Sequence, residues 1–287
     1  MPGGPAVELG RITPADLEEV GEFLHAHLNE RLSARQWSAA LVPPWPAPEP
    51  DHGFLLRAAG EVVGAYLAFY SVRQIGGATE RFCNLAAWCV GEEYRSHGLR
   101  LLRAALGRKG YHFTDLSPSG NVVPLNLRLG FTALDTSASL VLNLPWPPRA
   151  GTRVVSEPRE IDGLLTGQEL QVYRDHARAA AARHLVVVQG ERTCYVIYRR
   201  DRRKRLPLFA SILHVSDREL FAAAVGPVRR HLLGRGLPLT LAEDRVTGPL
   251  PGPAVRLTRT RSKMYRSRTL RPEQVDYLYS ELTCVPW

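Results

Sequence analysis

The chain has 287 residues, 45% of them hydrophobic, and carries 37 Lys and Arg against 28 Asp and Glu, a formal net charge of +9. This length exceeds that of most single domains, so two domains are expected. The lack of any apolar run of about 18 residues argues against a membrane-spanning helix. The segment Met1–Glu8 lacks the basic and apolar parts of a secretory signal, which makes the cytoplasm the expected location.

The charge is unevenly distributed along the chain. Residues 1–150 hold 13 basic and 14 acidic residues, so the remaining 24 basic and 14 acidic residues place the whole basic excess in the second half. Cys83 and Cys89 lie too far apart along one predicted strand for a disulfide, and Cys194 and Cys284 have no metal-like spacing to any pair of histidines. All four cysteines are predicted to be buried small hydrophobes, and no metal site is predicted.

The first elements follow from local signals. Val7–Ile12 predicts a strand. Thr13 has the character of a helix N-cap with Pro14 in the first helical position, and the apolar spacing within Leu17–Leu24 predicts the helix that follows. The proline-rich segment Val42–Pro50 predicts a loop, because its prolines cannot continue a helix.

Antiparallel strands are predicted to lead into a strand, a turn and a helix. Phe54–Ala58 and Val62–Ser71 predict a hairpin. Cys83–Val90 is an apolar run of strand length, and apolar residues recur at helical spacing in Leu99–Leu106. The turn between this strand and this helix is therefore Tyr94–Gly98.

This turn has the composition of an anion site. Gly98 can take a positive φ and has no Cβ, so the backbone there could approach a ligand closely. Free N–H groups and the positive end of the helix dipole favour an anion such as a pyrophosphate, and Arg95 and Arg100 add charge beside it. A glycine needed only for steric reasons is the alternative.

The next elements continue an α/β pattern. Tyr111–Leu116 predicts a strand, and a turn through Asn121 leads into a short helix that ends at Leu129-Gly130-Phe131. Phe131–Leu144 predicts a final hairpin. The prolines of 145–148 then predict a domain boundary.

The ordered set of Arg95-x-x-Gly98, the following strand, Asn121 and the Leu-Gly-Phe element resembles the GNAT superfamily of acyl-CoA-dependent N-acyltransferases over most of residues 6–145. The resemblance implies acetyl-CoA or another acyl-CoA as donor and no metal. It places the pyrophosphate on the turn, the thioester on the central strand, and the pantetheine arm or the adenosine phosphate near Asn121. Arg100 stands where the family has a second small residue. The implied cofactor-binding residues are Trp88, Cys89, Val90, Arg95, Ser96, His97, Gly98, Leu99, Arg100 and Asn121.

The residues for proton transfer depart from the family's pattern. The family often has a carboxylate on the central strand and a tyrosine in the helix before Leu-Gly-Phe, whereas Cys83–Val90 has no Asp or Glu and the Leu-Tyr pair reads Leu125-Asn126. Asn126 can donate a hydrogen bond to the coenzyme A sulfur but cannot deliver a proton. Glu80 and His112 remain as candidate acid–base residues. Their alternatives are a solvated strand-end carboxylate and a satisfied core histidine.

The second half repeats the first in outline. After Val215 the residues Ser216 and Asp217 can cap a helix, but no glycine accompanies them, so the second lobe is predicted to be degenerate and to lack a pyrophosphate loop. The predicted elements are helix over Glu157–Arg183, strands at Leu185–Gln189, Thr193–Arg199 and Leu208–Val215, a helix at Arg218–Arg235, a strand at Leu237–Ala242, a long strand at Val255–Ser267 and a terminal helix at Pro272–Leu282.

A basic run, Arg199–Arg205, separates two strands of this lobe. It is either a solvated hairpin tip or a site for an acidic partner, such as an anionic sugar, a lipid, membrane headgroups or RNA. No recognisable nucleic-acid module or aromatic stacking pattern accompanies it, so nucleic acid is not the expected partner.

The sequence thus predicts an α/β protein of two GNAT-like lobes, each a mixed, mainly antiparallel sheet flanked by helices. Residues 1–148 would form the acyl-CoA-binding domain and residues 149–287 the degenerate one. The expected function is transfer of an acyl group, most simply acetyl, from acyl-CoA to an amine of a small molecule or peptide. The alternative is a non-catalytic acyl-CoA-binding or interaction protein whose basic second lobe binds an acidic partner.

Overall fold

The computed structural model describes residues 6–203, 206–258 and 260–287. The chain divides into two compact units, each of which is discontinuous in sequence. Unit 1 takes the residues up to Ala133 together with Lys263–Gln274 and Tyr279–Trp287, and unit 2 takes Leu134–Ser262 with Val275–Leu278. The division thus falls between Ala133 and Leu134, upstream of the boundary predicted after Pro148, and the chain returns to unit 1 near its C-terminal end.

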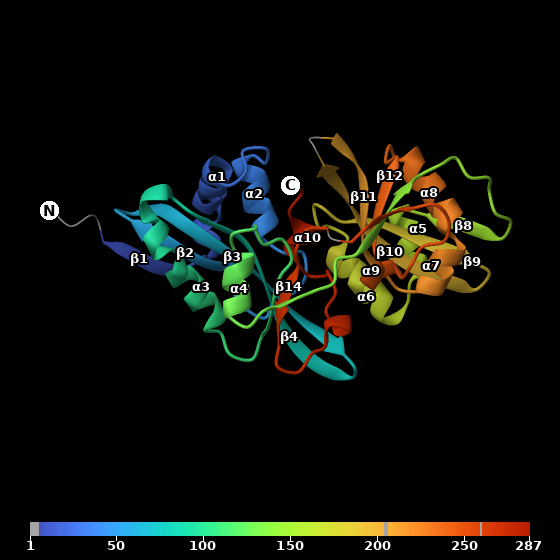
Figure 1. Ribbon diagram of the computed structural model, residues 1–287. Coiled ribbons are helices and arrows are strands. Elements are labelled where there is room, and N and C mark those ends of the chain that lie inside the picture. The colour runs from blue at the N-terminus through green and yellow to red at the C-terminus, as the bar shows by residue number, and fades with distance from the viewer. Residues whose placement is uncertain (1–5, 204–205, 259) are drawn as a thin grey trace. The chain divides into compact units, whose positions relative to one another are not determined.

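Unit 1 is built on a seven-stranded sheet of order β1-β2-β3-β4-β5-β14-β6 (Figure 1). All neighbouring strands are antiparallel except β4 and β5, which are parallel. The strands are β1 (Val7–Arg11), β2 (Gly53–Ala58), β3 (Glu61–Ile75), β4 (Ala78–Val90), β5 (His112–Asp115), β6 (Thr132–Ala133) and β14 (Met264–Arg266).

Two tight turns fix the register of β2, β3 and β4. Ala59 and Gly60 join β2 to β3, and Gly76 and Gly77 join β3 to β4, all with positive φ. Two-residue turns of this hand match the right-handed twist of antiparallel strands. Gly76-Gly77 is therefore the tip of a long hairpin, and β4 begins at Ala78, five residues before the predicted start.

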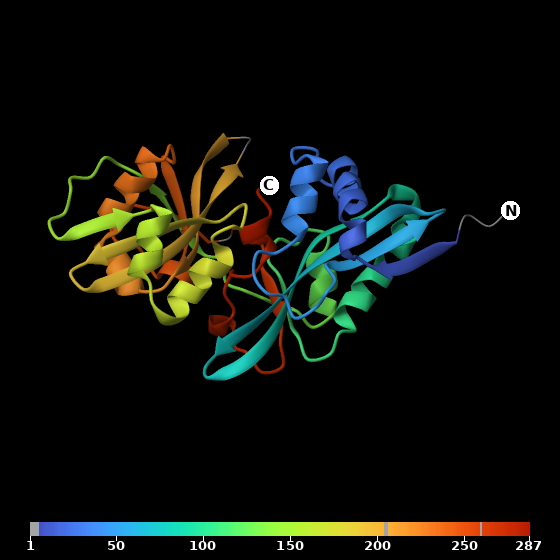
Figure 2. The same cartoon turned by 180° about the vertical axis from the view of Figure 1, so that it is seen from behind.

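Helices cover both faces of this sheet (Figures 1 and 2). Apolar residues of α1 and α2, among them Leu24 and Trp37, pack against one face, and Leu101 and Leu102 of α3 pack against the other. The predicted cap at Thr13 is present as a reciprocal pair with Asp16. The helical segments are η1 (Pro14–Asp16), α1 (Leu17–His27), α2 (Ala34–Leu41), η2 (Glu92–His97), α3 (Gly98–Leu106), α4 (Val123–Arg128), η3 (Pro272–Gln274) and α10 (Glu281–Cys284).

Unit 2 has a seven-stranded sheet of order β13-β7-β12-β11-β10-β9-β8. Only β11 and β12 are parallel. The strands are β7 (Ala138–Leu142), β8 (Thr152–Val155), β9 (Arg183–Gln189), β10 (Arg192–Arg203), β11 (Leu206–Val215), β12 (Leu239–Glu243) and β13 (Val255–Leu257). The helices are α5 (Pro158–Leu164), α6 (Gly167–His176), α7 (Arg218–Ala223), α8 (Val225–Gly234) and α9 (Asp244–Thr247).

The two sheets have the same topology. Strands β1 to β5 correspond to β8 to β12, and β14 stands beside β5 as β7 stands beside β12. The internal repeat and the predicted fold class, two lobes that each have a mixed, mainly antiparallel sheet with helices, are therefore confirmed. Asp217 caps α7 and its Oδ1 accepts a hydrogen bond from Leu220 N at 2.9 Å.

Several predictions about the strands and helices near the lobe junction and the C-terminus were wrong. The expected hairpin Phe131–Leu144 does not form, because β6 lies in the first sheet and β7 in the second. The expected strand Val255–Ser267 is divided between β13 and β14, which also belong to different sheets. Pro272–Leu282 contains only the short η3 and the beginning of α10, and Arg218–Arg235 is two helices with Ala224 between them.

All four cysteines are free and buried, as predicted. Within the described residues no helix is both long and apolar enough to cross a membrane.

Candidate functional site

The parallel strands β4 and β5 separate at one end. They are paired from Phe82 with His112 to Leu85 with Asp115, where β5 stops while β4 continues to Val90. Beyond Leu85 the side of β4 that faced β5 is therefore no longer covered by that strand.

A bulge in β4 lies at the same level. The pairing with β3 passes from Leu67 opposite Ala86 to Ala65 opposite Cys89, so β4 has an extra residue there. Ala87 carries the irregularity, with a φ of 51°. A left-handed conformation costs a residue with a Cβ roughly 1–2 kcal/mol, so the surrounding sheet must hold the bulge in place. Bulges of this kind bend the strand and increase its local twist.

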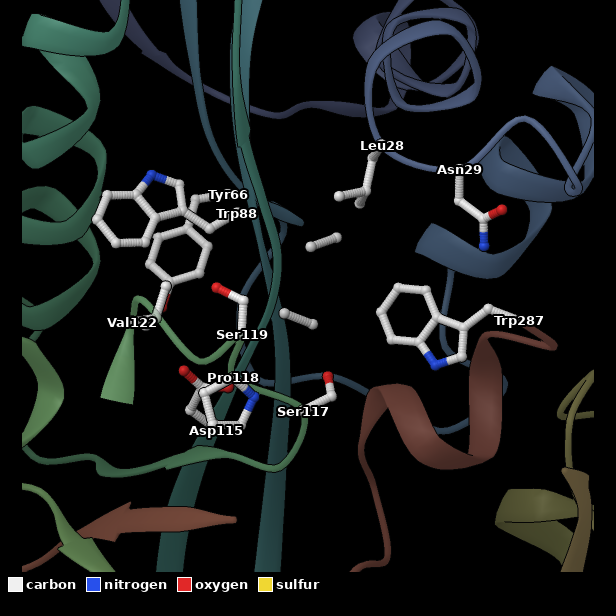
Figure 3. Close-up of a pocket in the computed structure, with 12 residues that line it drawn as sticks. Leu28, Asn29, Tyr66, Trp88, Asp115, Ser117, Pro118, Ser119, Val122 and Trp287 are labelled. Carbon is white, nitrogen blue, oxygen red and sulfur yellow. The ribbon is translucent and has the colours of Figure 1, made fainter. Parts of the chain in front are cut away.

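A pocket of about 270 Å³ occupies this opening (Figure 3). Tyr66 and Trp88 stack on one side of it with ring centroids 5.4 Å apart, and Leu28, Asn29 and Trp287 lie on the other. The pocket is lined by Leu28, Asn29, Tyr66, Ala86, Ala87, Trp88, Asp115, Ser117, Pro118, Ser119, Val122 and Trp287, all from unit 1.

Two buried carboxyl groups lie at the wall formed after β5. Ser117 Oγ donates to Glu281 Oε1 at 2.6 Å, and Asn126 Nδ2 donates to Asp115 Oδ2 at 2.8 Å. Glu281 comes from α10, and its backbone N–H donates to Asn84 Oδ1 of β4 at 3.0 Å. The C-terminal segment thereby places a carboxylate behind a serine that is 164 positions earlier in the sequence and lines the pocket.

Burial governs the ionisation of both carboxyl groups. It raises the pKa of Asp115 to about 6, while hydrogen bonds from Asn126 and from the backbone of Ser117 oppose the rise. Burial raises the pKa of Glu281 to about 7, opposed by the Ser117 hydrogen bond and increased by the charge of Asp115. Carboxyl groups that change protonation near neutral pH are suited to general acid–base chemistry.

Two buried polar atoms behind the pocket wall, Glu281 Oε2 and Asn126 Oδ1, have no hydrogen-bond partner within the described residues. Leaving such atoms unsatisfied in a folded protein costs roughly 1–3 kcal/mol each. They therefore mark a place where a ligand or water gains hydrogen bonds.

The predicted central-strand residues have different environments. Trp88 lines the pocket, whereas Cys89 is buried in the core beneath α1 and α2, where burial raises the pKa of its thiol to about 11. Val90 packs in the opposite core, beside Gly98. Asn121 is exposed in the turn before α4.

The predicted turn differs from a glycine cradle. Gly98 is helical with a φ of −55°, so the positive φ that a glycine can take is not used here. The reason is that η2 runs directly into α3, and Gly98 N–H donates to the carbonyl of Arg95. The first turn of this helical segment holds Glu92 and Glu93, whose charges oppose an anion at that end.

The side chains around Gly98 are partly committed to protein contacts. Arg95 forms an exposed ion pair with Glu92 at 3.4 Å. Arg100 Nη1 donates to the carbonyl of Val7 at 2.8 Å and lies 3.2 Å from His97 Nδ1. Ser96 and Leu99 are exposed.

The predicted acid–base residues lie away from the pocket. Glu80 Oε2 and His112 Nε2 are 2.8 Å apart, and His112 Nδ1 is 2.9 Å from Ser267 Oγ. His112 is at the start of β5, whereas the pocket lies beyond the end of that strand. Asn126 is fully buried, and its Nδ2 donates to Asp115.

Sequence reasoning missed Asp115, Ser117 and Glu281. A carboxylate that ends an apolar strand and is followed by a serine was a usable signal for the first two. For Glu281 the sequence offered none, because only the fold of the C-terminal segment brings it to β4. No group of three or more His, Cys, Asp or Glu residues suited to a metal ion occurs in the part of the chain that the structure describes.

No protein-family model matches the chain, and no curated protein matches its sequence. Solved structures do match it. A GCN5-related N-acetyltransferase from Anabaena variabilis is similar with a TM-score of 0.59 and 11% identity, covering 91% of this chain and 72% of its own. A putative acetyltransferase from Pyrococcus horikoshii is similar with a TM-score of 0.57 and 15% identity, covering 94% of this chain and 91% of its own.

A third similar structure is the N-myristoyltransferase of Saccharomyces cerevisiae with bound myristoyl-CoA, with a TM-score of 0.54 and 10% identity over 99% of this chain and 86% of its own. At these identities the likeness concerns the fold. The chain has the two-lobed fold of the GNAT superfamily, as the sequence resemblance predicted.

Proposed function

We propose that unit 1 is an acyl-CoA-dependent N-acyltransferase whose reaction takes place in the pocket between β4 and β5. The observation that carries the proposal is the link from pocket to buried base: Ser117 lines the pocket and its hydroxyl is hydrogen-bonded to Glu281. Acyl transfer from a thioester to an amine forms a C–N bond, breaks the C–S bond, and moves one proton from the amine to the departing thiolate.

Glu281 accepts this proton through Ser117. The ionised carboxylate takes the hydroxyl proton of Ser117 as Ser117 Oγ takes one from the attacking amine, and the same pair then returns a proton to the departing thiolate. A base works best when its pKa is near the operating pH, and burial brings the pKa of Glu281 to about 7. Asp115 adds negative charge beside it, which favours the protonated form of Glu281 once the proton has arrived.

The bulge supplies the other half of the chemistry. Beyond Leu85 the strand β4 is not paired with β5, so backbone N–H groups near Ala87 and Trp88 can donate to the oxygen of the thioester. Such donors stabilise the charge that develops on that oxygen in the transition state. Tyr66 and Trp88 then form the donor side of the pocket, and Leu28, Asn29 and Trp287 the acceptor side.

The size of the pocket favours a short acyl group. Its volume of about 270 Å³ is slightly below the roughly 300–1,000 Å³ of pockets that enclose a drug-sized ligand. It has room for the thioester end of acetyl-CoA, whereas the nucleotide lies outside it. We place the pyrophosphate near the exposed Arg95 and Ser96 rather than on a glycine cradle, because Gly98 is helical.

The test compares two serines that both line the pocket. Ser117→Ala removes the hydroxyl bonded to Glu281, and Ser119→Ala is the matched control. Acetyl-CoA and longer acyl-CoAs are incubated with a panel of primary amines, and the released thiol is measured. General-base catalysis contributes about 10²–10⁴-fold, so Ser117→Ala should lower kcat by about that factor while Ser119→Ala changes it little. Calorimetric titration with acetyl-CoA should give equal affinities for both variants.

The outcomes separate the two functions that the sequence left open. If acyl-CoA binds but the thiol is released no faster than without protein, the chain has a non-catalytic acyl-CoA-binding role. Turnover that Ser117→Ala leaves intact removes the proton path through Glu281. Absence of acyl-CoA binding removes the proposed function altogether.

A further inference from the structure

Unit 2 has a pocket of its own that the acyl-transfer proposal does not use. Its volume is about 400 Å³, and it lies between α8 and β8. It is lined by Pro148, Arg149, Thr152, Val154, Pro227, Arg230, His231, Gly234 and Arg235.

The charge of this lining has one sign. Three of the residues are arginines and none is Asp or Glu. Arg149 Nη1 donates to the carbonyl of Ala223, and Arg235 Nη2 donates to Ser156 Oγ at 2.5 Å. Among residues 6–203, 206–258 and 260–287, none of the three arginines pairs with a carboxylate, and the side chain of Arg230 makes no hydrogen bond. Neutral acceptors therefore orient two of the guanidinium groups without compensating their charge.

His231 adds a neutral polar group to the wall. Its Nε2 is buried and has no hydrogen-bond partner within the described residues. Burial, together with the neighbouring Arg235, lowers its pKa, so the ring is neutral at physiological pH. A neutral imidazole can donate or accept one hydrogen bond at that nitrogen, and a ligand in the pocket would satisfy it.

We propose that this pocket binds the phosphate monoester of a small molecule. A monoester is close to a dianion at neutral pH and offers three acceptor oxygens, which suits three guanidinium groups that bind such oxygens in pairs. Pro148, Val154 and Pro227 give the pocket an apolar part for the body of the ligand. The lining has no Phe, Tyr or Trp on which a nucleobase could stack.

This site differs from the basic run Arg199–Arg205 that the sequence singled out. Arg199 and Asp201 are buried within β10, and Lys204 and Arg205 lie outside the described residues. Arg200 Nη2 donates to the carbonyl of Arg235 at 2.7 Å, so one member of the run supports the segment that lines the pocket.

The experiment is a calorimetric titration of the full chain with glucose 6-phosphate, inorganic phosphate and glucose at low ionic strength. Glucose 6-phosphate should bind and glucose should not, and added salt should weaken the binding. Arg230→Gln should weaken it at least tenfold. Arg178→Gln removes the same charge from an exposed residue of unit 2 outside the pocket and should leave it unchanged. Thermal unfolding curves check that both variants are folded.

Three results would overturn the proposal. The first is that neither glucose 6-phosphate nor phosphate binds. The second is that Arg230→Gln and Arg178→Gln weaken binding equally, which would indicate attraction to the overall positive charge of unit 2 rather than to this pocket. The third is binding only to vesicles that contain phosphatidic acid, which present the same monoester on a surface and would make the ligand a lipid headgroup. Acyl transfer by unit 1 is assayed separately and stands or falls independently.

Discussion

Glu281→Gln probes the buried carboxyl group on which the proposed proton path depends. Glutamine keeps the size of the side chain and an oxygen that can accept the hydrogen bond of Ser117, but it cannot ionise. Because Glu281 is fully buried and its pKa is raised, the folded state holds the proton more tightly than the unfolded chain does. Its contribution to stability is therefore complete below the ordinary pKa of 4.5 and is lost as the pH rises through about 7.

The size of this loss follows from the shift. Each pKa unit corresponds to about 1.4 kcal/mol, and the pKa rises from 4.5 to about 7. Between pH 5 and pH 8 the wild-type chain should accordingly lose about 2–3 kcal/mol of unfolding free energy through this one group. Asp115, whose pKa burial raises from 3.8 to about 6, adds a loss in the same direction at slightly lower pH.

The assay is urea unfolding at pH 5 and pH 8, monitored by tryptophan fluorescence. Four of the five tryptophans, at positions 37, 45, 88 and 287, lie in unit 1, so the signal reports mainly on that unit. The wild type should lose about 2–3 kcal/mol more than Glu281→Gln over this pH range. Glu273→Gln, at an exposed residue of the same C-terminal segment, should behave as the wild type. Equal losses in wild type and Glu281→Gln would refute a titrating Glu281 and with it the proton path.

Three further changes test the framework of each unit. Arg108 bridges Glu49 and Asp51, with Nη1 2.8 Å from Glu49 Oε2. Arg108→Ala should cost about 2 kcal/mol in the same urea assay, because both carboxylates lose a charged donor while Glu49 keeps Arg81 and Asp51 keeps Arg11. Ala87→Gly should leave the melting temperature unchanged or higher, whereas Ala87→Val should lower it, since a β-branched residue tolerates a φ of 51° poorly. Tyr277→Phe should lower the unfolding free energy by about 2 kcal/mol, because it removes a donor to the buried carboxylate of Glu243 in unit 2. Circular dichroism measures this unfolding, and thiol release should not change.

The elements that sequence predicts well are those with local causes. The hairpin of Phe54–Ala58 and Val62–Ser71, the cap at Thr13 and the strand, turn and helix around Gly98 depend on residues within a few positions of one another. The placement of β7 and β14 does not. A short apolar strand has the same pattern whichever sheet receives it, so nothing local separates β7 from the hairpin that Phe131 was expected to begin.

The candidate site shows the same limit. Sequence named Glu80 and His112 as separate acid–base candidates, and the structure brings them into contact at the end of the strand pair opposite the pocket, because the open end is set by where β5 stops. Gly98 was assigned a pyrophosphate site from its place between strand and helix and from the resemblance, whereas the preceding η2 gives it an ordinary helical backbone. Of the central-strand residues that the resemblance implied for the thioester, Trp88 lines the pocket, and its role there remains a prediction.

The repeat explains why only one unit is expected to react. Asp115 ends β5 and Glu243 ends the corresponding strand β12, so each unit buries a carboxylate at the same place in its topology. In unit 2 both oxygens of Glu243 are used: Oε2 accepts from the hydroxyl of Tyr277, and Oε1 accepts from Thr260 Oγ1 at 3.2 Å. A carboxylate held in this way is a structural anchor.

In unit 1 the corresponding region is left incomplete. Asp115 lines a pocket, its neighbour Glu281 keeps Oε2 without a partner, and Asn126 keeps Oδ1 without one. Unsatisfied buried groups cost stability. Unit 2 satisfies both oxygens of its corresponding carboxylate, so the same fold can accommodate such hydrogen bonds. Under the proposed function, these unsatisfied groups are where a ligand of unit 1 would gain hydrogen bonds.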